Sequence, residues 1–500
     1  MTTLQALISP SRRLRARYLR FHPDVWVVGA LSVGLFSFMT SEPALTAACL
    51  LALPVGASLL WRRGEPPVLF AAFFLQWLSV STGVFRADLQ GQTLQTSYGV
   101  PGVVTAAWLS LIGLLVLAAG MRIALRGAPP IRFDVLLAEV RQYRLQRVMI
   151  AYLGAWIALS GLEVIMWRVP GLGQLLFALA NFRWAFFFVL AVTVLVQRRG
   201  YPLLALAFGM ELIAGFTSFF SEFRLVFFVF ALAFLTARSR LKQRTVLVLM
   251  VVFAAVLTIS AMWSLVKGDY REFLNQGTGR QVVLVGPVER IEKLYELVSD
   301  AGLKSLPSGF EALANRIQYI EYFGRVVDYV PAVVPHEGGA IWWGAVRHVL
   351  MPRLFFPNKP ALTSDVVMLE RFTGARIIVQ SGTQTEVPMG YMAESYIDFG
   401  AWGMFLPISL LGMLYGLGYR HFVSRQHYLL FALGAMAGIA ELTMRFEVTS
   451  AKILGGGLTS FAAMFLALKF GAPYVHRWLT GDHALRSNTE SLTRVRAVKR

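Results

Sequence analysis

Ionisable side chains inside long apolar segments are the first candidates for chemistry in this sequence. A charge at the centre of a bilayer costs roughly 2.5–3.5 kcal/mol, so each such residue suggests a function. If the apolar segments cross a membrane in alternating directions, six of these residues lie in the half of their segments that is nearer a long loop. They are Glu163, Arg183, Arg224, Glu441, Arg445 and Glu447. Glu211 lies nearer the middle. The pattern favours a charged cavity that opens toward the loop; the alternatives are charges that snorkel to the interface and an ion pair between Glu441 and Arg445.

A second set of reactive groups lies in the run from Gly390 to Gly400, directly before an apolar segment. In a helix, Glu394 and Asp398 share one face, with Tyr391 close by. Two crowded carboxylates at a membrane surface can supply a general base for a hydroxyl group. They can equally stabilise the start of the helix, where the dipole favours acidic residues.

The stretch from Met351 to Pro360 adds two cations, Arg353 and Lys359, to a segment whose three prolines exclude a regular helix. Arginine suits phosphate or pyrophosphate because its planar guanidinium binds two oxygens at once.

The chain has one cysteine, Cys49, and no cysteine–histidine spacing of a metal site. We therefore expect neither a metal nor another cofactor.

The elements that must position these groups are membrane helices. Hydrophobic residues make up 56% of the chain and charged residues 15%, and the apolar residues fall in blocks of the length that about 30 Å of hydrocarbon requires. The sequence predicts an all-α polytopic membrane protein of about twelve transmembrane helices. Their approximate bounds are 24–40, 43–61, 66–85, 101–121, 148–167, 173–197, 201–219, 223–237, 245–266, 399–419, 428–447 and 452–470.

The net charge of +19 is explained by the orientation of these helices. Alternate connections, such as 122–147 and 238–244, are rich in arginine and lysine, whereas the intervening short turns are nearly uncharged. Cytoplasmic connections carry such an excess of positive charge. We therefore expect both termini to be cytoplasmic, and we expect no nucleic-acid partner.

The long loop between the ninth and tenth predicted helices has a different composition. Residues 267–390 contain 13 basic and 13 acidic residues, a balance typical of an ordered soluble segment. Amphipathic stretches at 289–298 and 310–330 predict helices that either lie on the membrane surface or pack on each other. Thr363 or Ser364 can begin a short helix that ends at Gly374. The predicted units are an N-terminal membrane bundle (1–266), a periplasmic loop subdomain (267–398), C-terminal membrane helices (399–470) and a basic cytoplasmic tail (471–500).

With these features together, the sequence resembles bacterial O-antigen and exopolysaccharide repeat-unit polymerases of the Wzy type. The resemblance covers the polytopic plan with its late periplasmic loop. It also covers three local patterns: Ser221-Glu222-Phe223-Arg224, the Met351–Pro360 stretch and the Gly390–Gly400 run. It implies a multi-pass glycosyltransferase of the bacterial inner membrane that transfers a glycan from undecaprenyl pyrophosphate to another lipid-linked repeat unit.

The resemblance also implies roles for individual residues. Glu394 would take the proton of the acceptor, while Arg224 and Arg353 would act on the pyrophosphate. The remaining residues assigned to substrate binding are Lys359, Arg445, Tyr391, Tyr396, Asp398 and Arg183, and Trp342 and Trp343 are further candidates for stacking on sugars. Expected partners are the lipid-linked substrates, membrane lipids, a chain-length regulator and a flippase.

Two other functions fit much of the same pattern. A lipid-linked glycan ligase would need nearly the same site as a polymerase. A non-enzymatic transporter would also place charges within its membrane segments, but we would then expect repeated halves or helices broken near the middle of the membrane. The sequence shows neither feature.

Overall fold

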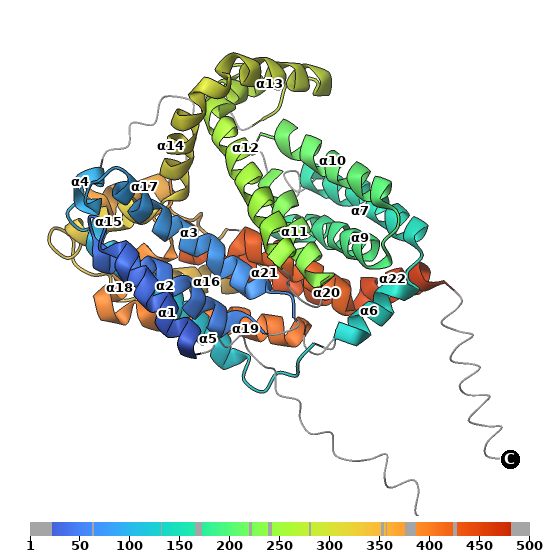
Figure 1. The fold of residues 1–500 in the computed structure, drawn as a ribbon, viewed down its shortest axis with the longest axis horizontal. Helices are drawn as coiled ribbons and strands as arrows, with labels where there is room; N and C mark the ends of the chain where they lie inside the picture. Colours follow the sequence, from blue (N-terminus) through green and yellow to red (C-terminus); the bar gives the residue numbers. More distant parts are fainter. Residues whose placement is uncertain are drawn as a thin grey trace, which may run out of the picture.

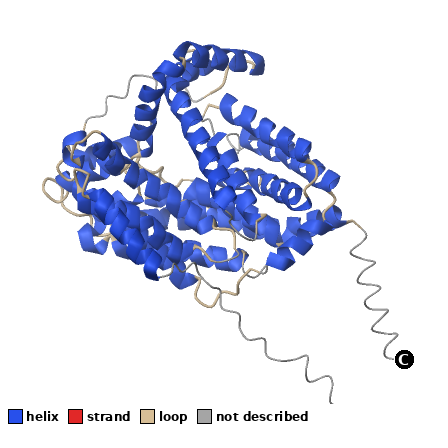
Figure 2. Ribbon diagram, in the orientation of Figure 1, coloured by secondary structure: helices blue, strands red, loops and turns tan. Residues whose placement is uncertain are grey.

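The computed structural model describes residues 23–62, 65–131, 133–165, 173–219, 223–238, 243–279, 282–351, 355–356, 358–375, 387–423 and 428–481. Helices account for nearly all of the regular structure in these ranges (Figure 2). This confirms the all-α prediction. The helices of the N-terminal part are α1 (Pro23–Ser37), α2 (Pro43–Leu60), α3 (Val68–Leu89), α4 (Leu94–Tyr98), α5 (Val103–Ala124), α6 (Phe133–Gln142), α7 (Leu145–Ile165), α8 (Gly173–Ala180), α9 (Arg183–Gln197), α10 (Tyr201–Thr217), α11 (Phe223–Thr236) and α12 (Gln243–Asn275).

The remaining helices belong to the long loop and the C-terminal part. The loop contains α13 (Pro287–Ala301), η2 (Leu303–Ser305), α14 (Leu306–Ile317), α15 (Ile320–Tyr329), α16 (Ala340–Leu350) and α17 (Asp365–Thr373). The C-terminal part contains α18 (Tyr391–Gly403), α19 (Phe405–Phe422), α20 (Leu429–Thr443), α21 (Ser450–Leu466), η3 (Ala467–Gly471) and α22 (Ala472–Thr480).

Each predicted transmembrane segment falls on one or more of these helices. Seven helical segments in the described ranges are long and apolar enough to cross a membrane, or eight if the bent pair α18 and α19 forms one span. Four further apolar helices are shorter, such as α11 with 14 residues, which is about 21 Å at 1.5 Å per residue. The chain is therefore a membrane protein, while the count of twelve spans stays a prediction.

The centre of the fold is the contact between α5 and α19, where glycines allow the two backbones to meet. A Cβ atom on Gly412 would lie 2.2 Å from the carbonyl oxygen of Leu117, and one on Gly120 would lie 2.4 Å from that of Ser409. Small residues permit this close approach between membrane helices. Close packing also occurs at Gly457 of α21, where a Cβ atom would lie 2.8 Å from the Tyr415 hydroxyl.

The long loop is built into the bundle. Helix α15 packs against α5, and its residues Ile320, Phe323 and Val326 are fully buried in the main core. Helix α14 packs on α12 and α3, and α16 packs on α21. Helix α13, at the top of the view in Figure 1, and the short η2 that follows it have no buried residue. The loop helices therefore pack on membrane helices, and the contacts described show no separate layer of loop helices.

The observed limits of three helical segments can be compared with the limits predicted from the sequence. Two differ and one agrees. Helix α12 continues nine residues beyond the predicted end at 266, so the loop begins later. The predicted amphipathic stretch 310–330 is broken at Gln318 and Tyr319 into α14 and α15. The predicted short helix is confirmed as α17, which follows Ser364 and ends before Gly374 in a left-handed conformation.

The predicted span 399–419 is not a straight helix. Its two parts, α18 and α19, meet at 118°, and Gly400 has φ 70° inside α18. A positive φ of this kind is accessible to glycine without strain. The bend turns the helix that carries Glu394 and Asp398 away from the axis of α19.

Candidate functional site

Five cations gather where α12 leaves the bundle for the long loop. Arg224 lies in the first turn of α11 and Arg316 in the last turn of α14. Lys267 and Arg271 lie one turn apart near the end of α12, and Arg445 lies between α20 and α21. Arg224, Arg316 and Arg445 interact electrostatically with one another, and Lys267 and Arg271 both interact with Arg316. We call these five residues the cation cluster, and the end of the bundle where they lie the loop-side end.

The cation cluster holds more positive charge than its neighbours neutralise. The Arg271 Nε donates to the Phe219 carbonyl oxygen at 3.1 Å, and Arg445 forms an ion pair with Glu441 at 2.6 Å. Within the part of the chain that the structure describes, Arg224, Lys267 and Arg316 have no hydrogen-bonded or ion-paired partner. The carboxylates that interact with Arg224 are those of Glu441 and Glu447. This arrangement suits an anion with several oxygens.

Close helix packing brings these cations together. A Cβ atom on Gly309 of α14 would lie 2.8 Å from the Ala261 carbonyl oxygen of α12, so these helices touch through their backbones. A Cβ atom on Gly215 of α10 would lie 2.7 Å from the Phe223 Cα. The Phe223 ring stacks on that of Phe216, with centroids 4.3 Å apart. A small apolar core therefore fixes the start of α11 beside α12.

Tyr319, in the break between α14 and α15, is a neutral group beside the cluster. Burial, and then the negative charge of Glu447, raise the pKa of Tyr319 above its ordinary value. Its hydroxyl donates to the Pro388 carbonyl oxygen at 2.5 Å. Tyr319 thus connects the loop helices to the segment that precedes α18.

Glu394 and Asp398 each bind the first turn of another helix. The Glu394 Oε2 accepts from the Ser450 backbone N–H at 2.6 Å, at the start of α21. The two Asp398 oxygens accept from the N–H groups of Ile341 and Trp342, at 3.1 and 2.8 Å, in the first turn of α16. Both carboxylates are buried. Helix starts favour such negative charges, so the geometry assigns both acids a positioning contact; the predicted base role of Glu394 stays a prediction.

The aromatic residues assigned to substrate binding point into the protein. The Tyr391 hydroxyl donates to the Gln76 Oε1 at 2.7 Å, and the Tyr396 hydroxyl donates to the Val330 carbonyl oxygen at 3.1 Å. The Trp342 Nε1 donates to the Ser395 Oγ at 3.0 Å. Of the four candidate aromatic residues, Trp343 alone is on the surface, with 68% of its area exposed.

The other predicted cations lie apart from the cluster or outside the described residues. The Lys359 Nζ donates to the carbonyl oxygens of His348 and Met351, at 2.5 and 2.9 Å, and so caps the end of α16. Arg183 interacts electrostatically with Tyr152, whose hydroxyl donates to the Glu211 Oε1 at 3.0 Å. Glu163 is on α7, and Arg353 lies outside the described residues.

Sequence reasoning brought Arg224 and Arg445 together and missed Lys267, Arg271 and Arg316. The missing signal was the continued apolar face of α12, since Trp263, Val266, Tyr270 and Leu274 recur at helical spacing and are all buried. That pattern places Lys267 and Arg271 on a helix. No local pattern could place Arg316 beside them, because α14 is joined to α12 by a long connection.

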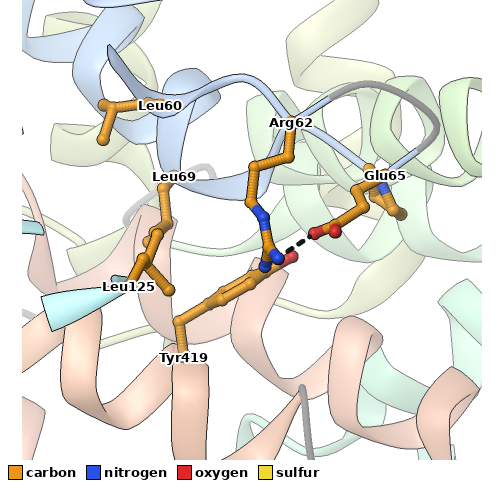
Figure 3. Close-up of a pocket in the computed structure, with 7 residues that line it drawn as sticks. Leu60, Arg62, Glu65, Leu69, Leu125 and Tyr419 are labelled. Carbon is orange, nitrogen blue, oxygen red and sulfur yellow. Dashed lines mark ion pairs between the residues drawn. The ribbon is translucent and has the colours of Figure 1, made fainter. Parts of the chain in front are cut away.

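A charged pocket directly after the C-terminal end of α2 is structural. Arg62 and Glu65 form an ion pair at 3.2 Å with nearly no exposed area, beside Leu60, Leu69, Leu125 and Tyr419 (Figure 3). Arg62 donates to the Ala128 and Pro129 carbonyl oxygens, and Glu65 accepts from the Ile131 N–H. The cavity of about 10 Å³ has room for at most one water molecule.

Comparison with known proteins gives a family without a described activity. Residues 102–425 match the model of a domain of unknown function, DUF8712, and the chain therefore belongs to this family. Neither the curated proteins nor the solved structures contain a match to the chain. The matched range includes four of the five members of the cation cluster, since Arg445 follows its last residue.

Proposed function

We propose that this DUF8712 protein is a membrane-embedded glycosyltransferase that joins oligosaccharide repeat units carried on undecaprenyl pyrophosphate. The observation that carries the proposal is the cation cluster at the loop-side end of the apolar helices. Its ligand would be the diphosphate of the donor, with the polyprenyl chain held in the membrane. The orientation predicted from the basic connections places this reaction at the periplasmic face of the bacterial inner membrane.

The chemistry of the transfer explains why such a cluster is useful. When the acceptor hydroxyl attacks the anomeric carbon, the bond from that carbon to the phosphate oxygen breaks, and the electron pair leaves with the diphosphate. Negative charge grows on the leaving group during this step. Fixed cations close to that charge stabilise the transition state more than the ground state.

Arg224 is the cation that we expect to contribute most. It lies in the first turn of α11, where the positive end of the helix dipole adds to its charge. Arg316 and Lys267, neither of which has a hydrogen-bonded or ion-paired partner in the described ranges, are free to bind further diphosphate oxygens. Arg445 is anchored by Glu441 and so offers a fixed guanidinium at the edge of the cluster.

The test is reconstitution of the purified protein with lipid-linked repeat units as the sole sugar source. A ladder of products without added nucleotide sugar or metal supports the proposal. Arg224→Ala and Arg316→Ala should each reduce the rate by about 10²- to 10³-fold, because each removes a group that stabilises the leaving charge. Arg224→Lys should retain part of the rate because it keeps the charge but loses the planar fork.

The matched control is Arg325→Ala on α15. Arg325 is paired with Glu321 at 2.8 Å and has 41% of its side chain exposed, so its loss should leave the rate within about twofold of wild type. Equal activity in wild type, Arg224→Ala and Arg316→Ala would contradict the assignment of the cluster. A single transfer to a non-lipid-linked acceptor, with no ladder, would identify the ligase reaction instead.

A further inference from the structure

The carboxylates near the cation cluster differ in whether they are already engaged. Glu441 is paired with Arg445 at 2.6 Å, and Asp365 is paired with Lys452 at 2.5 Å. Glu394 binds the start of α21 through the Ser450 N–H. Glu447 has neither a hydrogen bond nor an ion pair through its side chain to any residue in the described ranges. It is therefore the carboxylate of this set that is available to a substrate.

The backbone on both sides of Glu447 is held in place. The Tyr391 N–H donates to the Val448 carbonyl oxygen at 2.8 Å, which joins the connection between α20 and α21 to the start of α18. On the other side, a Cβ atom on Gly390 would lie 2.6 Å from the Phe446 carbonyl oxygen. Gly390 has φ 87°, so both its conformation and its surroundings require glycine. The half-buried Glu447 side chain is thus attached to a rigid support.

Charged or polar residues from three separate parts of the fold interact with Glu447. It interacts electrostatically with Arg224 of α11, with Arg316 of α14 and with Tyr319 in the break before α15. Two of these residues belong to the proposed diphosphate site. A sugar whose diphosphate binds Arg224 and Arg316 would therefore have its reacting carbon in the neighbourhood of Glu447.

We propose that Glu447 is the general base of the transfer, an inference that rests on the proposed glycosyltransferase function. An ionised carboxylate only accepts hydrogen bonds and can receive the proton of a hydroxyl group. In the step, the acceptor oxygen forms a bond to the anomeric carbon, its proton passes to Glu447, and the bond to the phosphate oxygen breaks. The electron pair of that broken bond leaves with the diphosphate bound by the cation cluster.

The variant that tests this assignment is Glu447→Gln, which keeps the size of the side chain and removes the proton acceptor. The rate with saturating donor and acceptor should fall about 10²- to 10⁴-fold, the usual contribution of a general base. The KM values for both lipid-linked substrates should stay within about threefold of wild type. Glu447→Asp should recover part of the lost rate.

Two matched variants separate this role from others. Glu441→Gln removes the carboxylate six residues earlier and should change the rate less than about tenfold, through its effect on Arg445. Glu394→Gln tests the residue that the sequence indicated as base. The assignment to Glu447 would be overturned if Glu394→Gln lost its activity with an unchanged melting temperature while Glu447→Gln stayed active. A fall in melting temperature for Glu447→Gln that accounts for its loss of activity would also overturn it.

Comparing the wild-type protein with Glu447→Gln tests the base assignment separately from the proposed glycosyltransferase function. If the wild-type protein forms a product ladder and Glu447→Gln forms it at the same rate, the base assignment fails and the glycosyltransferase function stands. If the wild-type protein forms no product from any lipid-linked donor, the function itself fails. Loss of turnover in Glu447→Gln with substrate binding retained supports both.

Discussion

The carboxylate of Asp398 accepts a hydrogen bond from the backbone N–H of Trp342 at 2.8 Å, across 56 residues of sequence. With the second bond from Ile341, this contact fixes the start of α16 on the last full turn of α18 before Gly400. Glu394 makes the equivalent contact with α21, one turn earlier on the same helix. Helix α18 is therefore the support on which the beginnings of two other helices are placed.

The first prediction concerns this support. Asp398→Ala should lower the free energy of unfolding by about 1–3 kcal/mol, because two buried N–H groups lose their acceptor. Asp398→Asn should cost less, since the amide oxygen can still accept one bond. Denaturant titration in detergent would measure both changes, and equal stability of wild type and Asp398→Ala would contradict the contact.

The second prediction concerns the buried ion pair of Arg62 and Glu65 in Figure 3. Arg62→Met alone should cost about 3–5 kcal/mol, because it leaves the Glu65 carboxylate buried without its counter-charge. The double variant Arg62→Met with Glu65→Leu should recover much of that loss. A double variant less stable than Arg62→Met in the same denaturant titration would show that the hydrogen bonds to the 128–131 segment matter more than charge.

The third prediction is a dependence of stability on pH that comes from Glu139 on α6. Burial raises the pKa of Glu139 from 4.5 to about 7, although the Tyr143 hydroxyl donates to it at 2.7 Å. Because the folded state binds this proton more tightly than the unfolded state, the contribution of Glu139 to stability is largest below about pH 4.5. It should fall as the pH rises to about 7, by roughly 3 kcal/mol.

Melting curves between pH 4.5 and pH 8 would measure this effect. His476 also faces this group, with its Nδ1 3.9 Å from the Glu139 Oε1. Glu139→Gln should remove the contribution of Glu139 and so make the pH dependence shallower, while His476→Gln should keep that contribution. A wild-type protein whose stability rises over the same interval would contradict the sign.

The fourth prediction concerns the contact between α5 and α19. Gly412→Ala would place a Cβ atom 2.2 Å from the Leu117 carbonyl oxygen, so the helices must move apart. We expect a loss of about 1–3 kcal/mol or more, as for overpacked cores. The control is Gly154→Ala on α7, where nothing lies within 4 Å; it should be neutral or should stabilise by up to about 1 kcal/mol.

Several features of this protein follow from the sequence alone. Each of the twelve apolar blocks falls on one or more helices of the described ranges, and Ser364 and Gly374 marked the limits of α17. These features depend on neighbours within a few residues, since hydropathy, helical spacing and the freedom of glycine act along the chain.

The partners of the charged residues were decided by the tertiary structure. Helical spacing put Glu394 and Asp398 on one face of α18, but it could not show that they bind the starts of α21 and α16. Likewise, Arg316 meets Arg224 only because α14 packs on α12 beside the start of α11. Such contacts join residues far apart in the chain. They depend on how whole helices pack, and one sequence carries no local signal for that.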